Sequence, residues 1–313
     1  KLDALVEAGS PRREDGGDSL GPIKEEARLL RAAARLELSA SLPPGRDGER
    51  SVLDRGAASD LAHLLEHLSP PSEVFRAALH IRGLSLEREG LEALALVQGV
   101  REEAGAGRRA AAERLEAAME AFERVLATAD AWRTMPEEGR EPVQGWVIAA
   151  LDRLASIAEK IGRLDVAREC LMRLSALGDS GSPVQSDGPR LRAILPFPPH
   201  ETERRVASAG YRRGDLAFFQ GDLELALEEY TSALSLHGTS RLAPWGHLRR
   251  GEIFRRKGDE AACRKELELL RFRLAVEEKA AEETAAGADA LRRWRGAFLS
   301  HLTRLESARE KKR

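Results

Sequence analysis

The chain contains few aromatic residues and no long apolar run. Aromatic residues make up 4% of its 313 residues, and segments rich in Val, Ile, Thr and Tyr, which are typical of strands, are almost absent. The composition therefore disfavours a β-rich fold. No apolar run approaches the ~20 residues that a membrane-spanning helix needs, so the sequence predicts no transmembrane segment and leaves a membrane-associated complex open.

Cysteine is also scarce. Cys170 and Cys263 are the only two, and no CxxC pair is present. This pattern predicts neither a disulfide framework nor a zinc site of that type, and we expect both thiols to act as small buried side chains. Cysteine usage favours a reducing compartment, the cytoplasm over the periplasm, without deciding the location.

Other signatures of chemistry are missing as well. The chain has no GxxxxGK[ST] loop for nucleotide phosphates, and its formal net charge of -2 gives no overall attraction to nucleic acid. We therefore predict no cofactor, no resident metal, no catalytic set and no nucleic-acid partner.

What the chain does contain is helix-forming sequence. Ala, Leu, Glu and Arg dominate, and charged residues make up 33%. Apolar residues recur at helical spacing, and Pro- and Gly-rich breaks separate them. This predicts an all-α chain in four parts, in order: a mobile lead-in at 1–21, an N-terminal helical lobe at 22–175, a long loop or joint at 176–201, and a C-terminal helical part at 202–313.

Two glycines seven residues apart recur in the C-terminal part. Gly214 and Gly221 are followed by the small Ala226, the bulky Tyr230 and the small Ala233; the second copy comprises Gly251, Gly258, Cys263, Leu267 and Leu270. The first glycine of each copy suits a close approach of two helices, and the second suits a left-handed helix end. Asp222 and Asp259 follow directly, where a short acceptor caps the next helix.

This spacing resembles the tetratricopeptide repeat, a helix–turn–helix unit of about 34 residues. The resemblance implies a right-handed superhelical array of antiparallel helix pairs, with a concave groove lined by the first helix of each pair. Two weaker copies have the same spacing. One starts at Gly83 but has Gly99 where a bulky residue is expected, and the other starts at Ala155 and includes Gly162.

The resemblance also predicts binding residues. Three arginines fall at equivalent positions of their units, with aromatic and further basic residues nearby. These groove residues are Arg153, Tyr211, Arg212, Phe219, Trp245, Arg249 and Arg256. Such a set suits a peptide that carries carboxylates. Repeat proteins that grip chaperone C-termini use Asn in this groove, whereas Asp215 and Glu252 stand here, which argues against that partner.

The function predicted from these patterns is a non-enzymatic scaffold that binds one or more proteins, of unknown identity, through its groove. Two alternatives stay open. His63, Glu66 and His67 match HxxEH, which resembles the zinc signature of pitrilysin-type metallopeptidases, with Glu141 near the distance of a third ligand. The Lys- and Arg-rich segment from Arg292 onward suits nucleic acid or anionic membrane, although its apolar residues predict a terminal helix that covers the end of the array.

Overall fold

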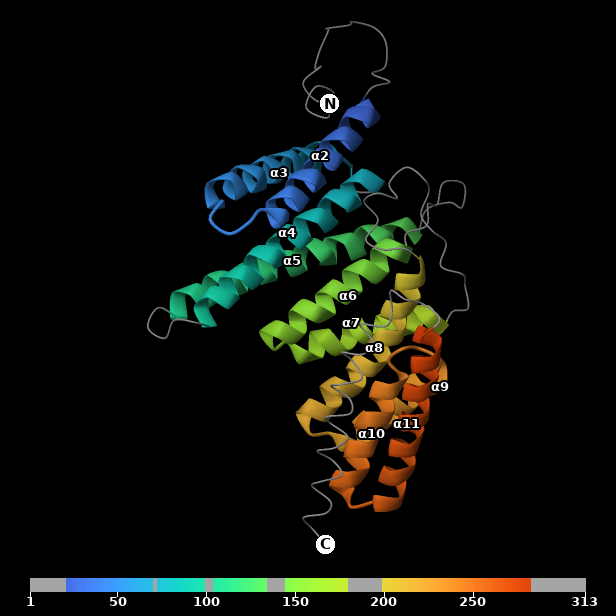
Figure 1. Ribbon diagram of the computed structural model, residues 1–313. Coiled ribbons are helices and arrows are strands. Elements are labelled where there is room, and N and C mark those ends of the chain that lie inside the picture. The colour runs from blue at the N-terminus through green and yellow to red at the C-terminus, as the bar shows by residue number, and fades with distance from the viewer. Residues whose placement is uncertain (1–20, 70–71, 99–103, 134–143, 180–198, 283–313) are drawn as a thin grey trace, which may run out of the picture. The chain divides into compact units, whose positions relative to one another are not determined.

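The structure is a computed structural model that describes residues 21–69, 72–98, 104–133, 144–179 and 199–282. Ten α-helices and no strand occur in these residues (Figure 1), which confirms the all-helical prediction for them. The helices are α2 (Gly21–Ser41), α3 (Asp47–His67), α4 (Glu73–Gln98), α5 (Ala104–Arg133), α6 (Gln144–Ile161), α7 (Leu164–Asp179), α8 (Pro199–Gln220), α9 (Leu223–His237), α10 (Ala243–Lys257) and α11 (Glu260–Glu282).

The chain divides into two compact units. One comprises Lys1–Cys170 with Ser182–Thr202, and the other comprises Leu171–Gly181 with Glu203–Arg313. The division falls inside α7. Both ends of the predicted joint at 176–201 are helical, because α7 continues to Asp179 and α8 begins at Pro199. Residues 180–198, the lead-in before Gly21 and the predicted terminal helix lie outside the described residues.

In the first unit, α2 pairs with α3, α4 pairs with α5, and α6 packs on α5. Glycines allow the closest of these approaches. A Cβ atom on Gly83 would lie 2.7 Å from the Phe122 ring, and one on Gly90 would lie 2.7 Å from Leu115 Cγ. Both glycines lie inside the unbroken α4, so the repeat copy predicted from Gly83 is wrong. Seven residues span about two helical turns, so two glycines at this spacing also mark one face of a single helix.

The later glycine pairs do mark helical hairpins. Gly162, Gly221 and Gly258 have φ angles of 79°, 84° and 78°, the left-handed region that glycine adopts without a Cβ penalty. They form the turns of α6–α7, α8–α9 and α10–α11. The predicted left-handed helix ends at Gly221 and Gly258 are therefore confirmed, and Gly162 has the same conformation.

The three turns share one hydrogen-bond pattern. In the α8–α9 turn, the amide of Gly221 donates to the Phe218 carbonyl (3.1 Å), and the amide of Asp222 donates to the Ala217 carbonyl (3.0 Å). The equivalent pairs of bonds close the turns at Gly162 and Gly258. This is the Schellman arrangement, which satisfies carbonyls that the end of a helix otherwise leaves unbonded.

The predicted caps follow two of these turns. The Asp222 side chain accepts a hydrogen bond from the Leu225 amide (3.0 Å), and the Asp259 side chain accepts one from the Ala262 amide (2.9 Å). Each carboxylate therefore starts the second helix of its hairpin directly after the glycine that ended the first. In the α6–α7 turn, Arg163 takes the corresponding place.

The contact between α8 and α9 is unusually close. A Cβ atom on Gly214 would lie 2.6 Å from Tyr230 Cε1, and one on Gly210 would lie 3.0 Å from the Ala233 Cβ. Tyr230 is fully buried in the space that Gly214 leaves. At the equivalent place in the next hairpin, a Cβ atom on Gly251 would meet Leu267 at an ordinary 3.4 Å. The two hairpins thus share a pattern but differ in how tightly they pack.

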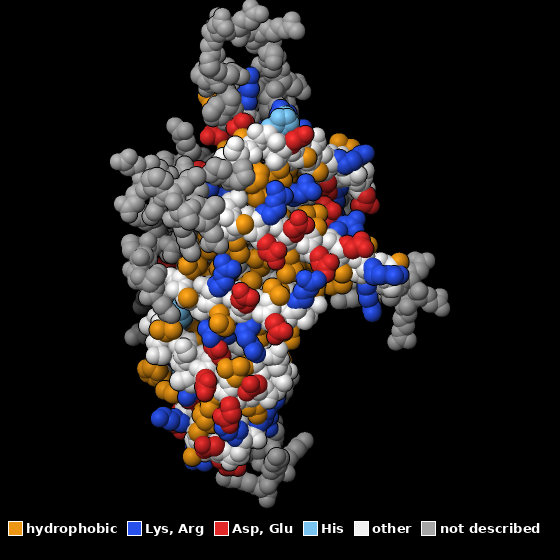
Figure 2. Space-filling view, turned by 180° about the vertical axis from the view of Figure 1, so that it is seen from behind, with side chains coloured by type: hydrophobic (Ala, Val, Ile, Leu, Met, Phe, Trp, Pro, Cys, Tyr) orange, Lys and Arg blue, Asp and Glu red, His pale blue; other side chains and the backbone are white. Residues whose placement is uncertain are grey.

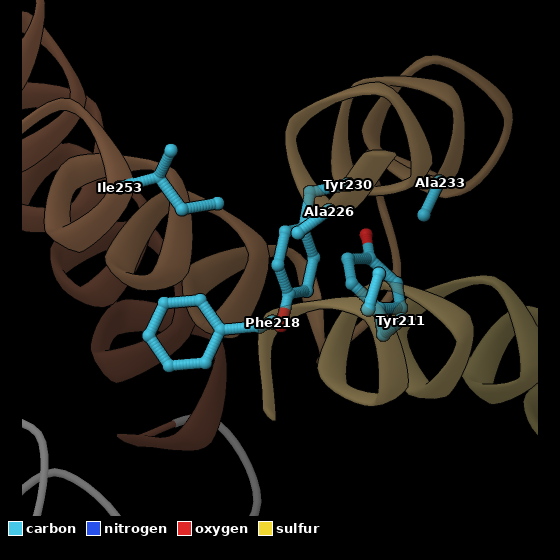
Figure 3. Close-up of a cluster of buried hydrophobic side chains, with 7 residues drawn as sticks. Tyr211, Phe218, Ala226, Tyr230, Ala233 and Ile253 are labelled. Atoms are coloured by element: carbon cyan, nitrogen blue, oxygen red, sulfur yellow. The ribbon is translucent and has the colours of Figure 1, made fainter. Parts of the chain in front are cut away.

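One of the two core clusters of the second unit joins three helices. Tyr211 points from α8 toward α9, Tyr230 points from α9 back toward α8, and Ile253 enters from α10 (Figure 3). The buried members of this core are Tyr211, Ala217, Phe218, Ala226, Tyr230, Ala233 and Ile253. Helix α10 also approaches α8 closely, because a Cβ atom on Gly246 would lie 2.8 Å from the Tyr211 ring.

The unequal packing gives a paired prediction. We expect Gly214→Ala to lower the free energy of unfolding by about 1–3 kcal/mol, because the new methyl group overlaps the Tyr230 ring. Gly251→Ala is the matched control at the equivalent position. It should be neutral or stabilising by up to ~1 kcal/mol, because alanine is the better helix former and the space is adequate. Urea unfolding followed by circular dichroism measures both, and equal effects of the two changes would contradict the packing described.

Candidate functional site

The predicted groove residues fall on three helices. Arg153 lies on α6 in the first unit, where its Nη1 atom is 3.5 Å from the buried Glu87 carboxylate. The other six lie in the second unit: Tyr211, Arg212 and Phe219 on α8, and Trp245, Arg249 and Arg256 on α10.

The Asp215 carboxylate connects α8, α9 and α10. It accepts hydrogen bonds from the Tyr230 hydroxyl (2.6 Å), the Trp245 indole Nε1 (3.0 Å) and the Arg249 Nε (3.2 Å). Gly214 has no side chain, which leaves room for the Tyr230 ring. Asp215 is the next residue, so the hydroxyl of Tyr230 reaches the Asp215 carboxylate. The sequence analysis had noted Asp215 only because it stands where repeat proteins that bind chaperone C-termini have Asn.

Arg249 is held on all sides rather than presented to solvent. Its exposed fraction is 8%, and its Nη1 atom donates to Glu252 (3.1 Å) while its Nε atom donates to Asp215. Its guanidinium carbon lies 4.3 Å from the Trp245 ring centroid and 4.7 Å from that of Phe218, within the range of cation–π attraction. Two carboxylates therefore compensate the charge that the sequence had assigned to a partner.

Phe219 and Arg256 lie on the outside of this arrangement. The Phe219 ring is 73% exposed and lies 5.2 Å from the Arg249 guanidinium carbon. The Arg256 side chain is 44% exposed, and its guanidinium carbon lies 4.3 Å from the centroid of the Phe218 ring. Its Nη2 atom pairs with the Glu252 carboxylate at 3.0 Å. We call the exposed Phe219 and Arg256, together with Phe218, Trp245 and Arg249 that support them from below, the Phe219 surface. Four of its five residues were among the predicted groove residues, and Phe218 was missed.

Besides Arg153, two predicted residues do not belong to the Phe219 surface. Tyr211 is 1% exposed, and its hydroxyl donates to the His237 carbonyl (3.2 Å), so it is part of the core instead. Arg212, the next residue along α8, is half-buried. Glu252, like Asp215, was not predicted to pair with arginine, although it lies three residues after Arg249 on the same helix.

The HxxEH segment lies on the surface of α3. His63, Glu66 and His67 are all exposed, the two imidazole rings stack with centroids 4.1 Å apart, and His67 Nδ1 lies 2.8 Å from the His63 carbonyl. Among the described residues, no group of three His, Cys, Asp or Glu side chains is arranged to hold a metal ion. Glu141, the suggested third ligand, lies outside them. The segment from Arg292 onward, on which the electrostatic alternative depends, lies outside them too.

The charged side chains on the surface of the molecule are of both signs. Basic and acidic side chains are interspersed over the face of the molecule in Figure 2, with apolar side chains between them. None of the described helices has both the length and the apolar composition that a bilayer span requires.

No protein-family model, curated protein or solved structure matches the chain. A function for the protein must therefore be argued from the geometry of its own residues.

The two tyrosines, Tyr211 and Tyr230, allow a pH prediction. Burial is the main cause that raises the pKa of both, and for Tyr230 the charge of the neighbouring Asp215 raises the pKa further. The pKa of both tyrosines is higher in the folded chain than the ordinary value of 10.0, so their contribution to the free energy of unfolding is fully present below that pH. This contribution falls as the pH rises above 10.0, because the tyrosines of the unfolded chain release their protons first.

We therefore expect the folded protein to show less tyrosinate absorbance near pH 10 than the chain in guanidinium chloride, in which both tyrosines ionise at the ordinary pKa. Ultraviolet difference spectroscopy during an alkaline titration measures this directly. Equal tyrosinate absorbance near pH 10 in guanidinium chloride and in protein that circular dichroism shows to be folded would contradict the buried positions of these rings.

The Asp215 contacts give a stability prediction. Asp215→Asn keeps the shape of the side chain but removes one of the two charges that compensate the buried Arg249, so the free energy of unfolding should fall by about 1–2 kcal/mol. Glu224→Gln is the control, because Glu224 is 74% exposed and pairs with Lys257 on the surface. That change should cost less than about 0.5 kcal/mol. Equal costs in urea unfolding would show that the Asp215 carboxylate has no special role.

Proposed function

We propose that the protein is a non-enzymatic scaffold of the tetratricopeptide-like class, in which stacked helix pairs form a right-handed superhelical array. The observation that supports this best is the identical turn in three hairpins, α6–α7, α8–α9 and α10–α11. A helical hairpin cannot bury its apolar face alone, so repeated hairpins are expected to stack on their neighbours. The packing of α10 on α9 and the approach of Gly246 to Tyr211 support such stacking for the last two pairs.

The proposed binding surface is the Phe219 surface. In a repeat of this class the first helix of each pair lines the concave side, and α8 and α10 are the first helices of their pairs. The rings of Phe218 and Phe219 pack edge to face with their centroids 5.7 Å apart, and the Arg249 guanidinium contacts both rings. Residues held in place before binding lose little entropy when a partner docks, which favours affinity.

The geometry narrows the chemistry of the partner. Arg249 is compensated by Asp215 and Glu252, so Arg256 is the more accessible cation of the surface. We infer that the partner presents an apolar side chain to the exposed Phe219 ring and a carboxylate to Arg256. A peptide segment or one face of a helix has both groups at suitable spacing. Such a partner needs one carboxylate rather than the several that the three arginines at equivalent positions suggested.

The test compares a double variant of the proposed surface with a control variant of an apolar residue of similar exposure. Phe219→Ala combined with Arg256→Ala alters the proposed surface, whereas Leu96→Ala alters a side chain that is 76% exposed on α4. Each tagged full-length variant is used to capture partners from the native source, and recovery is quantified by mass spectrometry against the unaltered chain. We expect at least one partner to be recovered about tenfold less with the double variant, equivalent to about 1.4 kcal/mol, and normally with Leu96→Ala. Unchanged recovery with the folded double variant would reject this surface.

A further inference from the structure

The two histidines of the HxxEH segment lie side by side on the surface of α3. His63 and His67 are exposed, whereas His80 and His247 are buried among other side chains. Residues four apart lie on the same face of a helix, about one turn from each other, and these two rings stack with their centroids 4.1 Å apart. Helix α3 therefore presents two neighbouring imidazoles to solvent.

A hydrogen bond determines which ring nitrogen of His67 is available. Its Nδ1 atom lies 2.8 Å from the His63 carbonyl oxygen, which can only accept a hydrogen bond. The proton of the neutral imidazole is therefore on Nδ1, and the lone pair is on Nε2. Histidines that bind metal ions commonly donate from one ring nitrogen to a carbonyl in this way, which orients the ring and leaves the other nitrogen as the ligand.

The separation of the two rings suits a single metal ion. Bonds from zinc to histidine nitrogen are about 2.0–2.1 Å long, so two such nitrogens on one ion lie roughly 3 Å from each other. The planes of the two rings differ by 23°. From a centroid separation of 4.1 Å, the rings need to approach by only ~1 Å, and small rotations of exposed side chains are sufficient for this.

The described residues supply two ligands for such an ion. No group of three His, Cys, Asp or Glu side chains among them is arranged to hold a metal. Glu66, the residue before His67, is exposed and adds a negative charge that attracts cations. Water molecules complete the coordination, so the ion of this site exchanges with solvent. Such a site differs from the closed, fully protein-bound sites in which structural zinc is held.

We propose that His63 and His67 form a two-ligand site for a divalent transition-metal ion, Cu²⁺, Ni²⁺ or Zn²⁺. All three ions accept imidazole ligands, and affinity at such sites is generally highest for Cu²⁺. The two histidines have the required spacing only while α3 is helical, so the bound ion links successive turns and stabilises the helix. The ion has no catalytic step to perform, and the site is independent of what binds to the Phe219 surface.

The first test measures the Kd of the full-length chain for Ni²⁺ by isothermal titration calorimetry, at neutral pH in a buffer that does not bind metals. His63→Gln and His67→Gln each remove one ligand, and His237→Gln is the control, because it removes a histidine from α9 instead. We expect the Kd to rise about tenfold or more with either ligand variant, because one imidazole replaces a chelating pair, and to be unchanged with His237→Gln. An unchanged Kd with both ligand variants would show that Ni²⁺ binds elsewhere and would overturn the site.

The second test asks whether the ion binds the folded helix. An ion that binds the folded chain more tightly than the unfolded chain shifts unfolding to higher denaturant concentration. At a Ni²⁺ concentration well above the Kd, the urea midpoint should rise for the unaltered chain and for His237→Gln but stay nearly constant for His63→Gln. Circular dichroism follows the unfolding. A midpoint of the unaltered chain that does not respond to Ni²⁺ would also reject a chelate that depends on the α3 helix.

Discussion

The close approach of α8 and α9 at Gly214 is the constraint on which the second unit depends. Any side chain at that position would overlap the Tyr230 ring, so the ring fits only because the residue is glycine. The buried ring brings its hydroxyl to Asp215, and the same carboxylate then binds Trp245 and Arg249 of α10. A single missing side chain thereby determines how three helices meet.

The two arginines of α10 at this surface, Arg249 and Arg256, differ in how accessible they are. A buried arginine costs free energy unless its charge is compensated, and Asp215 and Glu252 compensate that of Arg249 by accepting hydrogen bonds from its Nε and Nη1 atoms. What remains accessible is the ring of Phe219 and the side chain of Arg256. The scaffold function proposed above rests on this surface, in which an exposed aromatic ring lies beside a positioned cation.

Local signals in the sequence were sufficient for much of the fold. The left-handed glycines, the aspartate caps and the helical spacing are each determined by a few neighbouring residues, and the hairpin turns at Gly221 and Gly258 were predicted from them. The pair Gly83 and Gly90 misled because two glycines seven residues apart look alike in a hairpin and in one long helix. The role of Arg249 was missed because its partner Asp215 lies on another helix, far away in sequence, where no local pattern reveals the contact.

The indole N–H of Trp245 reports on the central contact most directly, because it donates to both oxygens of Asp215. Its hydrogen exchange with solvent is measured by NMR, with the resonance assigned from Trp245→Phe. If Asp215 joins α8 to α9 and α10 as described, this proton exchanges at least tenfold more slowly than that of a free indole under the same conditions. Exchange at the rate of a free indole would show that the contact does not exist and that α10 is held in some other way.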